Sequence, residues 1–261
     1  MPSIQINTPG RSSSIITDRS IRAVLPFIEG KRAVIITDEN LDRLYGGLFT
    51  DFQKIVLPPG ESSKNLDLVR RIYEQMIAAE VDRSCLILGV GGGVVCDIAG
   101  FVASTYLRGL DFGFVATSLL AQVDASIGGK NGVNFADAKN LIGTINQPRF
   151  VLCPQDVLQT LPREHLLNGM AEIIKTGAIG DAELLEVLTL KRAEILDLQP
   201  EALETVIGHT LTLKARIVES DEREQGERRL LNFGHTIGHA IEIATGMLHG
   251  QAVAIGMNLA A

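Results

Sequence analysis

Three of the five histidines in this 261-residue chain lie close together and could bind a metal ion. His235 and His239 stand four residues apart in a segment with helical periodicity, so both rings lie on one helical face. His249 follows shortly after a break at Gly246. A lone helical histidine is usually an ordinary core or surface residue. Three in one short segment, beside glycines that let a ligand approach closely, favour a metal site.

A glutamate and a lysine in an apolar segment could contribute to the same chemistry. Glu172 and Lys175 are three residues apart in GMAEIIKTG, so they share a helical face. They could form an ordinary exposed ion pair, but the residues around them are apolar, and charges in such surroundings need partners. Glu172 is therefore the candidate for a third metal ligand.

A run of three glycines could hold phosphate. Gly91, Gly92 and Gly93 follow an apolar strand pattern at 85–90, and a strand–glycine–helix unit presents backbone N–H groups to an anion. The dinucleotide fingerprint is incomplete, because Val94 stands where its third glycine would fall, and the Walker pattern is absent. Nucleotide binding and a simple tight turn both stay open. Asp38, after an earlier strand pattern, could equally bind a ribose hydroxyl or cap a helix.

Basic residues in two further segments could bind anions. Segment 124–143 mixes polar residues and glycines with apolar ones, which suggests a loop folded over a ligand, with Lys130 and Lys139 available in it. The charged segment 219–229 is expected to be a solvated loop for most of its length. Its exception is Arg228, which lies four residues before Asn232 and next to the histidine segment.

The elements that would position these residues change character after Pro162. Up to that point short apolar runs alternate with helical periodicity, which is typical of a parallel sheet with helices on its faces. The expected strands are 4–7, 31–37, 53–57, 85–90 and 150–153, and the expected helices are 18–28 and 66–79. Later segments at 163–178, 182–198 and 201–219 read as amphipathic helices without strands. We therefore expect an α/β domain at 1–157 and an all-helical domain at 158–261.

Composition excludes several classes of function. A net charge of -7 argues against a general nucleic-acid binder. No apolar run is long enough to span a membrane, and no secretory signal is visible, so we expect a cytoplasmic protein. The three cysteines are widely spaced without a CxxC pair and read as reduced core residues. The chain stops at Ala261 inside a helical pattern, so a longer native chain or a truncated one is expected.

Eight segments together resemble one known family. They are PPGESSK, GVGGGVVCDIAGFVASTYLRG, ATSLLAQVDASIGGKNGVN, KNLIG, NGMAEIIKTG, DERE, LNFGHTIGHAIE and LHGQAVAIGM. Over essentially its whole length the chain resembles the 3-dehydroquinate synthases. The resemblance implies an α/β fold with a Rossmann-like NAD domain, a helical metal- and substrate-binding domain, and an active site in the cleft between them.

The resemblance also implies a reaction. These lyases convert 3-deoxy-D-arabino-heptulosonate 7-phosphate to 3-dehydroquinate and phosphate in the shikimate pathway. Transient oxidation by NAD, phosphate elimination, reduction by the same NADH and an intramolecular aldol closure follow one another. The implied cofactors are NAD and Zn²⁺, with Co²⁺ as an alternative metal. The implied assembly is a cytoplasmic homodimer whose partner is a small phosphorylated sugar acid, with no nucleic acid and no membrane.

The family's functional residues map onto motifs of this chain. The metal ligands implied are Glu172, His235 and His249, whereas spacing alone would pair His235 with His239. His239 is implied to assist proton transfer beside the substrate. The other substrate-side residues implied are Asp124, Lys130, Lys175, Lys214, Arg228, Asn232 and, from the neighbouring subunit of a dimer, Arg108. The cofactor-binding residues implied are Asp38, Asn40, Glu61, Lys64, Gly91, Gly92, Gly93, Asp97, Thr117, Ser118, Lys139 and Asn140.

Departures from the family pattern leave rival interpretations. Gln251 stands where the family commonly has Glu after His-Gly, His165 stands where an acidic residue is more usual, and the family continues past Ala261. One rival is another sugar phosphate cyclase, of the 2-deoxy-scyllo-inosose or valiolone type. A second is a metal-dependent polyol dehydrogenase, which would release NADH, and a third is a non-catalytic nucleotide-binding relative. Lys214, Arg228 and Asn232 together favour a substrate with a carboxylate.

Overall fold

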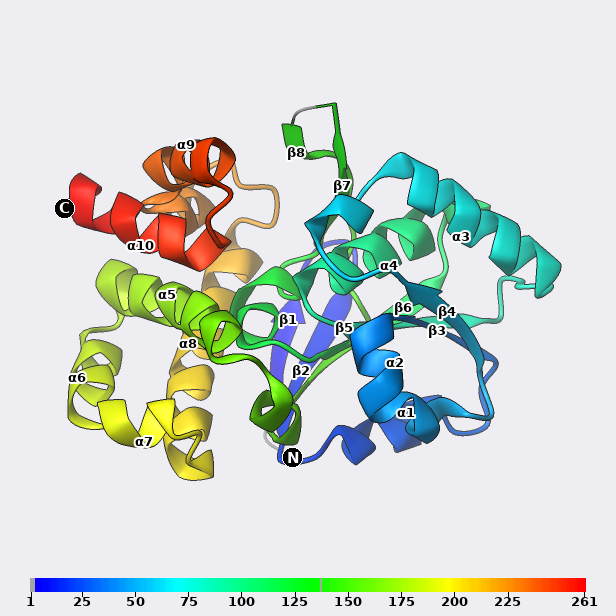
Figure 1. The fold of residues 1–261 in the computed structure, drawn as a ribbon, viewed down its shortest axis with the longest axis horizontal. Helices are drawn as coiled ribbons and strands as arrows, with labels where there is room; N and C mark the ends of the chain where they lie inside the picture. The colour runs from blue at the N-terminus through cyan, green and yellow to red at the C-terminus, as the bar shows by residue number, and fades with distance from the viewer. Residues whose placement is uncertain (1–2, 137) are drawn as a thin grey trace.

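A seven-stranded sheet forms one half of the molecule, as the computed structural model of residues 3–136 and 138–261 shows (Figure 1). The strand order is β1-β2-β9-β6-β5-β3-β4, and neighbours pair in parallel except β1 with β2. The strands are β1 (Ser3–Asn7), β2 (Ser12–Asp18), β3 (Ala33–Asp38), β4 (Gln53–Leu57), β5 (Leu86–Gly91), β6 (Asp111–Ala116) and β9 (Phe150–Pro154).

Helices cover both faces of this sheet, as the continuous apolar character of its inner strands requires. In β3, Ile36 packs in the large apolar cluster shared with the following helices, and the adjacent Ile35 packs in the smaller cluster on the other face. The helices and 3-10 turns of this half are η1 (Ile21–Val24), α1 (Leu25–Ile28), α2 (Glu39–Tyr45), η2 (Gly46–Phe49), η3 (Glu61–Ser63), α3 (Leu66–Ala78), α4 (Gly93–Thr105) and η4 (Tyr106–Arg108).

The other half of the molecule is helical and lies beside the sheet (Figure 1). It begins after η6 (Asp156–Thr160) and contains no strand among the residues that the structure describes. Its elements are α5 (Arg163–Gly180), α6 (Ala182–Leu190), α7 (Arg192–Leu196), α8 (Pro200–Ser220), η7 (Glu227–Asn232), α9 (His235–Thr245) and α10 (His249–Ala260). The helices α9 and α10 pack together and α10 also packs on α5, so the histidine segment lies on the helix that carries Glu172.

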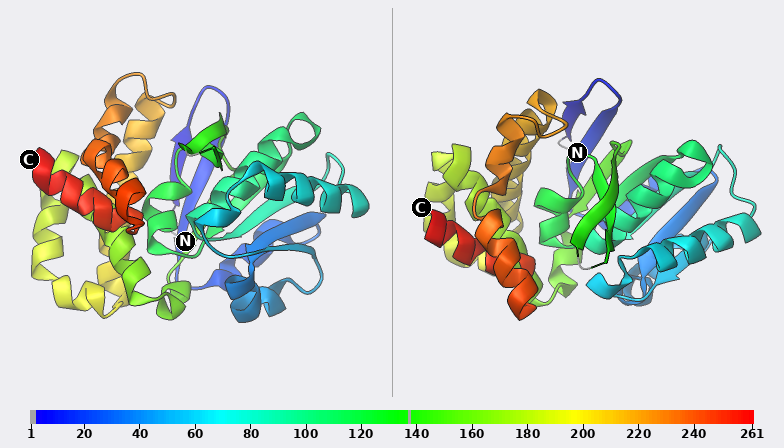
Figure 2. Two further views of the ribbon diagram at one scale, coloured as in Figure 1. Left: turned by 45° about the horizontal axis from the view of Figure 1, so that its top comes forward. Right: turned by 90° about the horizontal axis from the view of Figure 1, so that it is seen from above.

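A two-stranded hairpin projects from the sheet half at the junction of the two halves (Figure 2). Its strands, β7 (Lys130–Phe135) and β8 (Ala138–Ile145), pair antiparallel and follow a short π-helical turn, η5 (Ala121–Ala125). The sequence predicted a loop at 124–143. The ladder between residues 130–133 and 142–145 explains the difference, because it satisfies the backbone groups of a segment that lies outside the main sheet.

Two other expected elements are corrected by the structure. The segment 18–28 is not one helix, because Asp18 ends β2 and only η1 and α1 follow. The strand β2 was missed since four of the seven residues in its sequence, SSSIITD, are serine or threonine, and it is stabilised by pairing with β1 on one side and β9 on the other. The expected helix at 182–198 is divided at Lys191 into α6 and α7.

The two halves share one apolar core. The larger cluster of buried side chains includes Ile36 and Val102 of the sheet half together with Ile173 and Leu211 of the helical half. The sheet ends at Pro154 and α5 starts at Arg163, but the core continues across this point. A division into domains at 1–157 and 158–261 therefore stays a prediction. Within the described residues no helix has the length and apolarity needed to cross a membrane.

Candidate active site

Glu172, His235 and His249 meet where three helices converge. Glu172 lies in α5, while His235 and His249 are the first residues of α9 and α10. The Nε2 atoms of His235 and His249 lie 3.8 and 3.6 Å from Oε1 of Glu172, and one ligand atom from each residue falls within 4.8 Å of the others. This Oε1 is buried and has no hydrogen-bond partner among the described residues. A divalent cation would supply the missing partner, so the donor set fits a metal site with one carboxylate and two imidazoles.

Glycines bring the three helices close enough to form this cluster. Gly250 donates its backbone N–H to Oδ1 of Asn168 at 2.5 Å, and a Cβ at Gly250 would lie 2.0 Å from the Asn168 carbonyl oxygen. A Cβ at Gly256 would lie 2.1 Å from the carbonyl oxygen of Gly234. The close approach of α10 to both α5 and α9 therefore depends on residues that lack a side chain.

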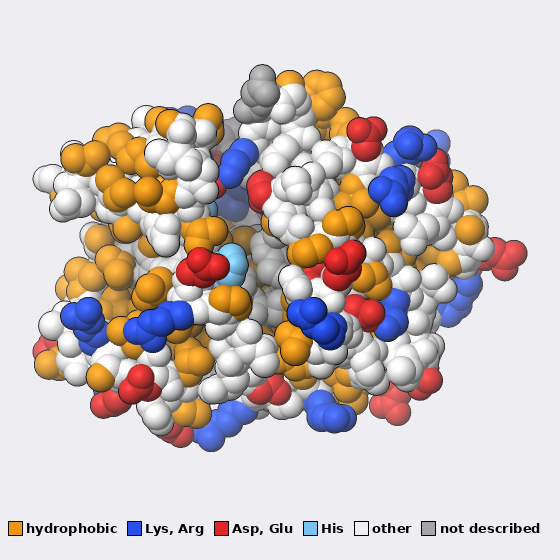
Figure 3. Space-filling model, in the orientation of Figure 1, with side chains coloured by type: hydrophobic (Ala, Val, Ile, Leu, Met, Phe, Trp, Pro, Cys, Tyr) orange, Lys and Arg blue, Asp and Glu red, His pale blue; other side chains and the backbone are white. Residues whose placement is uncertain are grey.

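The pair His235 and His239, four residues apart, does not converge on Glu172. The ring of His239 lies 5.2 Å from that of His235 but is exposed, and it falls in a second group with Glu242 and His249. Figure 3 shows a hollow between the two halves of the molecule. Burial, followed by the charge of His249, lowers the pKa of His239, so a neutral and exposed ring is available.

Burial and neighbouring charges shift the pKa values of the residues in and around the cluster. Burial alone would lower the pKa of His249, but the neighbouring carboxylates of Glu172 and Glu242 more than offset it and raise this pKa to about 9. Burial, then the charge of Lys175, lowers the pKa of His235. Burial would raise the pKa of Glu242, but hydrogen bonds from His249 and Lys139 bring it to about 2.

Two buried lysines hold carboxylates next to the cluster. Lys175 is 2% exposed and pairs with Glu172 one helical turn before it in α5. Lys214 of α8 donates to the backbone carbonyl of Asp124 at 2.7 Å and also to its carboxylate. Asp124 lies in the π-helical turn η5, a rare geometry that often occurs at functional sites. Burial raises the pKa of Asp124, but the neighbouring lysines overcome this and lower it.

Glu224 is a site residue that the sequence reasoning did not single out. Its carboxylate contacts both Lys130 at the start of β7 and the side-chain amide of Asn232 in η7. Arg228 is buried and donates to the carbonyl oxygens of Glu222, at 2.5 Å, and Gly128, at 2.9 Å. The segment 219–229 is thus only partly a solvated loop. Glu224 belongs to the DERE motif, but spacing alone did not distinguish it as a site residue from the other acidic residues of the segment.

Burial and nearby positive charge lower the pKa of Lys130. Burial is the largest cause, followed by the charges of Arg228 and Lys214, and together they bring this pKa to about 8. Three cations concentrated in one region form an electrostatic site for a substrate anion.

The glycine turn lies at the carboxyl edge of the sheet, where open α/β sheets bind their ligands. Gly91 ends β5, and Gly92 precedes α4, whose N-terminus no side chain among the described residues caps. A Cβ at Gly92 would lie 3.3 Å from Oγ of Ser118, and the backbone N–H of Thr117 donates to the Gly91 carbonyl at 2.9 Å. Backbone N–H groups of an uncapped helix beside a turn without side chains fit a pyrophosphate.

The remaining cofactor candidates surround this turn. Asp97 of α4 pairs with the buried Lys64, and burial raises the pKa of Asp97 to about 6 even though Lys64 opposes the shift. Glu61 accepts a bond of 2.8 Å from the side chain of Asn134 in the hairpin. Asn140 donates its backbone N–H to Oδ1 of Asn134 at 2.9 Å.

Asp38 and Arg108 lie apart from the cluster. Asp38 caps α2, since its Oδ1 accepts from the backbone N–H groups of Asn40 and Leu41 at 2.9 and 3.0 Å. Because Asp38 also ends β3 at the carboxyl edge, capping and ribose binding are compatible. Arg108 is exposed in η4, just before β6 begins, and no contact among the described residues joins it to the other candidates. The two residues that depart from the family pattern, His165 in α5 and Gln251 in α10, are half-buried and exposed.

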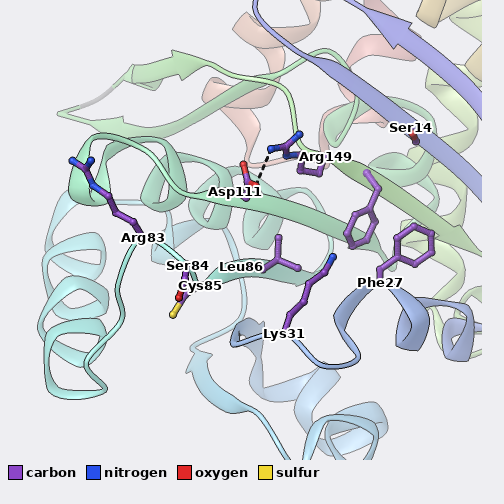
Figure 4. Close-up of a pocket in the computed structure, with 10 residues that line it drawn as sticks. Ser14, Phe27, Lys31, Arg83, Ser84, Cys85, Leu86, Asp111 and Arg149 are labelled. Carbon is purple, nitrogen blue, oxygen red and sulfur yellow. Dashed lines mark hydrogen bonds and ion pairs between the residues drawn. The ribbon is translucent and has the colours of Figure 1, made fainter.

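A cavity of about 590 Å³ lies at the opposite edge of the sheet and contains none of these residues (Figure 4). Leu86 and Asp111 begin β5 and β6, so the cavity opens at the amino ends of the parallel strands. Asp111 is shared by Arg11 at 2.7 Å and Arg149 at 2.9 Å, and this leaves no convergent set of groups for catalysis.

Fold and site together define a class of protein. A parallel sheet with a glycine turn at its carboxyl edge, joined to helices that carry a carboxylate–imidazole cluster, is the dehydroquinate synthase-like architecture. The family model of the 3-dehydroquinate synthase N-terminal region matches residues 54–168, and that of the C-terminal region matches residues 169–261. The chain belongs to the 3-dehydroquinate synthase family.

Individual relatives carry this name. A 3-dehydroquinate synthase from Symbiobacterium thermophilum is 44% identical over 92% of this chain and 70% of its own length. One from Solibacter usitatus is 42% identical over 100% of this chain and 76% of its own length. The chain therefore spans 70–76% of the length of these relatives.

Solved structures with the same fold include other sugar phosphate cyclases. ValA, a 2-epi-5-epi-valiolone synthase from Streptomyces hygroscopicus with NAD⁺ and Zn²⁺ bound, matches with a TM-score of 0.90 and 32% identity, over 97% of this chain and 74% of its own. A 2-deoxy-scyllo-inosose synthase complexed with carbaglucose-6-phosphate, NAD⁺ and Co²⁺ matches with a TM-score of 0.87 and 28% identity, over 100% of this chain and 74% of its own. A probable glycerol dehydrogenase from Sinorhizobium meliloti, at 18% identity, shares only the fold.

Proposed function

We propose that this chain is a 3-dehydroquinate synthase, which converts 3-deoxy-D-arabino-heptulosonate 7-phosphate to 3-dehydroquinate and phosphate. The observation that carries the proposal is the cluster of Glu172, His235 and His249 beside buried cations, at the junction of the sheet and the helices. Relatives that are 42–44% identical carry this name, whereas the structural neighbours with other cyclase names are 28–32% identical.

A divalent metal is proposed at Glu172, His235 and His249, since the orphaned Oε1 of Glu172 needs a positive partner. Such a metal supplies Lewis acidity that favours loss of a proton from a bound alcohol. Zn²⁺ is the metal we propose, with Co²⁺ as the alternative, because structural neighbours carry these ions. Three protein ligands leave positions open for substrate, as a catalytic rather than a structural site requires.

NAD is proposed at the carboxyl edge of the sheet, and when bound it supplies reversible hydride transfer. The glycine turn would hold the pyrophosphate, and Asp38 and Asn40 would lie on the adenosine side with Glu61 and Lys64 nearby. The residues proposed to line the cofactor toward the nicotinamide are Asp97, Thr117, Ser118, Lys139 and Asn140. Backbone N–H groups at the start of α4 would orient the cofactor at no cost in side-chain ordering.

The cations of the site would bind and orient the substrate. Lys130, Lys214 and Arg228 would face its carboxylate and phosphate, with the amide of Asn232 beside them. Asp124 and Lys175 would hydrogen-bond hydroxyl groups, because each already lies within the buried charge network. Held in this way, one end of the sugar acid is fixed while the phosphate departs and the ring closes.

His239 is proposed to move a proton at its ring nitrogen. It is exposed and lies outside the Glu172 group, and its lowered pKa keeps the ring neutral near pH 7, so it can accept a proton. We also propose that the chain works as a homodimer in the cytoplasm, in which Arg108 reaches the substrate phosphate of the partner. Its exposure and its separation from the other site residues support this placement.

Phosphate release tests the proposal. Full-length protein would be supplied with NAD and with 3-deoxy-D-arabino-heptulosonate 7-phosphate, after chelation of metal and again after Zn²⁺ is restored. Zn²⁺-dependent release of phosphate, formation of 3-dehydroquinate and no net NADH are the expected results. Turnover of sedoheptulose 7-phosphate or glucose 6-phosphate in its place would assign the chain to another cyclase. Net accumulation of NADH would instead identify a polyol dehydrogenase.

A further inference from the structure

Glu242 joins a proposed metal ligand to the hairpin of the sheet half. This residue lies in α9 and is 8% exposed. Its Oε2 lies 3.2 Å from Nδ1 of His249, and its Oε1 accepts a bond of 2.5 Å from Nζ of Lys139 in β8. One carboxylate therefore contacts α10 through one oxygen and the β7–β8 hairpin through the other.

The two contacts come from opposite halves of the molecule. The hairpin projects from the sheet half, and α9 lies across from it in the helical half (Figures 1 and 2). Lys139 precedes Asn140, whose backbone N–H bonds to Asn134, and Asn134 in turn bonds to Glu61 and to the carbonyl oxygen of Lys64. Through these bonds the hairpin continues to the residues proposed to hold NAD.

The chemistry of the His249 contact sets which nitrogen faces the proposed metal. An ionised carboxylate only accepts hydrogen bonds, so Nδ1 of His249 carries the proton and donates it to Glu242. In the neutral ring, the form that binds a metal, the lone pair is then on Nε2, the nitrogen that lies 3.6 Å from Oε1 of Glu172. Carboxylates in this position orient metal-binding histidines and increase their basicity.

We infer that Glu242 is a positioning residue that couples metal binding at Glu172, His235 and His249 to NAD binding beside the hairpin. A bound metal fixes His249, His249 fixes Glu242, and Glu242 holds Lys139 and the hairpin in place. Because such coupling is reciprocal, NAD tightens metal binding by the same factor as metal tightens NAD binding. This inference rests on the proposed metal and NAD sites.

Three variants separate the two contacts. Glu242→Gln keeps the size of the side chain but removes its charge, which weakens both contacts. Lys139→Met breaks the hairpin contact and leaves Glu242 with His249. Glu74→Gln is the matched control, since it makes the same substitution in an exposed ion pair with Arg70 on α3, far along the chain from the site.

Binding measurements on full-length protein then test the coupling. Zn²⁺ affinity would be measured by competition with a chromophoric chelator, and NAD affinity by calorimetry with and without Zn²⁺. In wild type and Glu74→Gln we expect Zn²⁺ to tighten NAD binding at least fivefold. Glu242→Gln should bind Zn²⁺ 10–100-fold more weakly. Lys139→Met should bind Zn²⁺ within about threefold of wild type in the absence of NAD, and both variants should lose the coupling.

The visible spectrum of the Co²⁺-loaded protein separates positioning from general destabilisation. It should change in Glu242→Gln, where His249 loses its orienting partner, and stay as in wild type for Lys139→Met. Wild-type Zn²⁺ affinity and undiminished coupling in Glu242→Gln would overturn the inference. So would a second metal ion in wild type that Glu242→Gln loses, because Glu242 would then be a ligand itself, with His239 and His249. A wild-type protein that binds no metal would instead refute the proposed site.

Discussion

Buried charges at the candidate site are only partly satisfied by one another. Glu172 and Lys175 are both almost completely buried, and one oxygen of Glu172 pairs with Lys175 while the other has no partner among the described residues. A buried carboxylate oxygen without a partner costs stability, so this arrangement is retained where a ligand completes it. Lys214 of α8 and Asp124 of η5 form a second lysine–carboxylate pair, in which the lysine is buried and the aspartate partly exposed. At the level of single residues, the proposed site offers a carboxylate oxygen to a cation and buried lysines to a substrate anion.

Asp97 makes one pH dependence testable. Burial raises its pKa in the folded state from 3.8 to about 6, so the folded protein binds more protons than the unfolded chain between these values. The free energy of unfolding that depends on Asp97 therefore falls as pH rises from about 4 to about 7. Relative to Asp97→Asn, wild type should lose about 3 kcal/mol over this range.

Urea denaturation without cofactors at several pH values measures this difference. Lys64→Met serves as the second variant, because removal of the opposing charge should raise the pKa of Asp97 further and enlarge the pH-dependent loss. Parallel profiles for wild type and Asp97→Asn would contradict the interpretation.

Helix packing, rather than the histidines themselves, decides where the cluster forms. The first residues of α9 and α10 come together because Gly234, Gly250 and Gly256 allow their backbones to approach closely. The sequence between the two helices is short and ends α9 at Gly246, which adopts a left-handed conformation at φ 70°. The same segment with larger residues would keep its helices but separate the histidines.

Substitution of Gly256 by alanine tests this packing. A Cβ there would lie 2.1 Å from the Gly234 carbonyl oxygen and 2.9 Å from the backbone nitrogen of Gly238, so α9 and α10 must move apart. Gly256→Ala should lower the free energy of unfolding by about 1–3 kcal/mol and weaken Zn²⁺ binding.

Gly208→Ala is the matched control for this test. Gly208 also lies inside a helix, α8, but its added Cβ would meet nothing within 4 Å. This substitution should stabilise the protein by about 0.5–1 kcal/mol, because alanine loses less backbone entropy in a helix. Equal effects of the two substitutions, measured by chemical denaturation, would exclude a packing role for Gly256.

The whole molecule places its ligand groups on two halves that share one core. The glycine turn and hairpin belong to the sheet half, and the Glu172 cluster belongs to the helical half. Contacts such as Lys214 with Asp124 and Lys139 with Glu242 join the two halves. Ligands that bridge this junction would stabilise both halves together.

Ligand binding should therefore raise the stability of the entire chain. At a concentration 100-fold above its dissociation constant, NAD or Zn²⁺ should each add about 2.7 kcal/mol to the free energy of unfolding. Chelation should remove the Zn²⁺ contribution. Thermal unfolding monitored by calorimetry would show a single transition that moves upward with each ligand. An unfolding temperature that stays unchanged when either ligand is added would argue against the proposed sites.

Much of this architecture follows from local sequence. The apolar run at 85–90 and the residues after it become β5 and α4 with little shift, because a buried strand, a glycine turn and a helix each have a strong local pattern. The change to helices after Pro162 was equally visible. Local pattern failed for β2, whose serines resemble a loop and whose strand exists only because β1 and β9 pair with it.

The candidate site, too, could be predicted from the sequence only in part. The apolar surroundings of Glu172 indicated it as a ligand, and motif resemblance added His235 and His249, but spacing alone favoured His235 with His239, since residues four apart share a helical face. The break at Gly246 and the packing of α10 on α5 bring His249 to Glu172 instead. Glu224 and Glu242 were not singled out as candidates, because their partners lie far away in sequence. Sequence determined the elements and the reactive groups, and tertiary packing decided which of these groups meet, since long-range contacts leave no periodic trace along the chain.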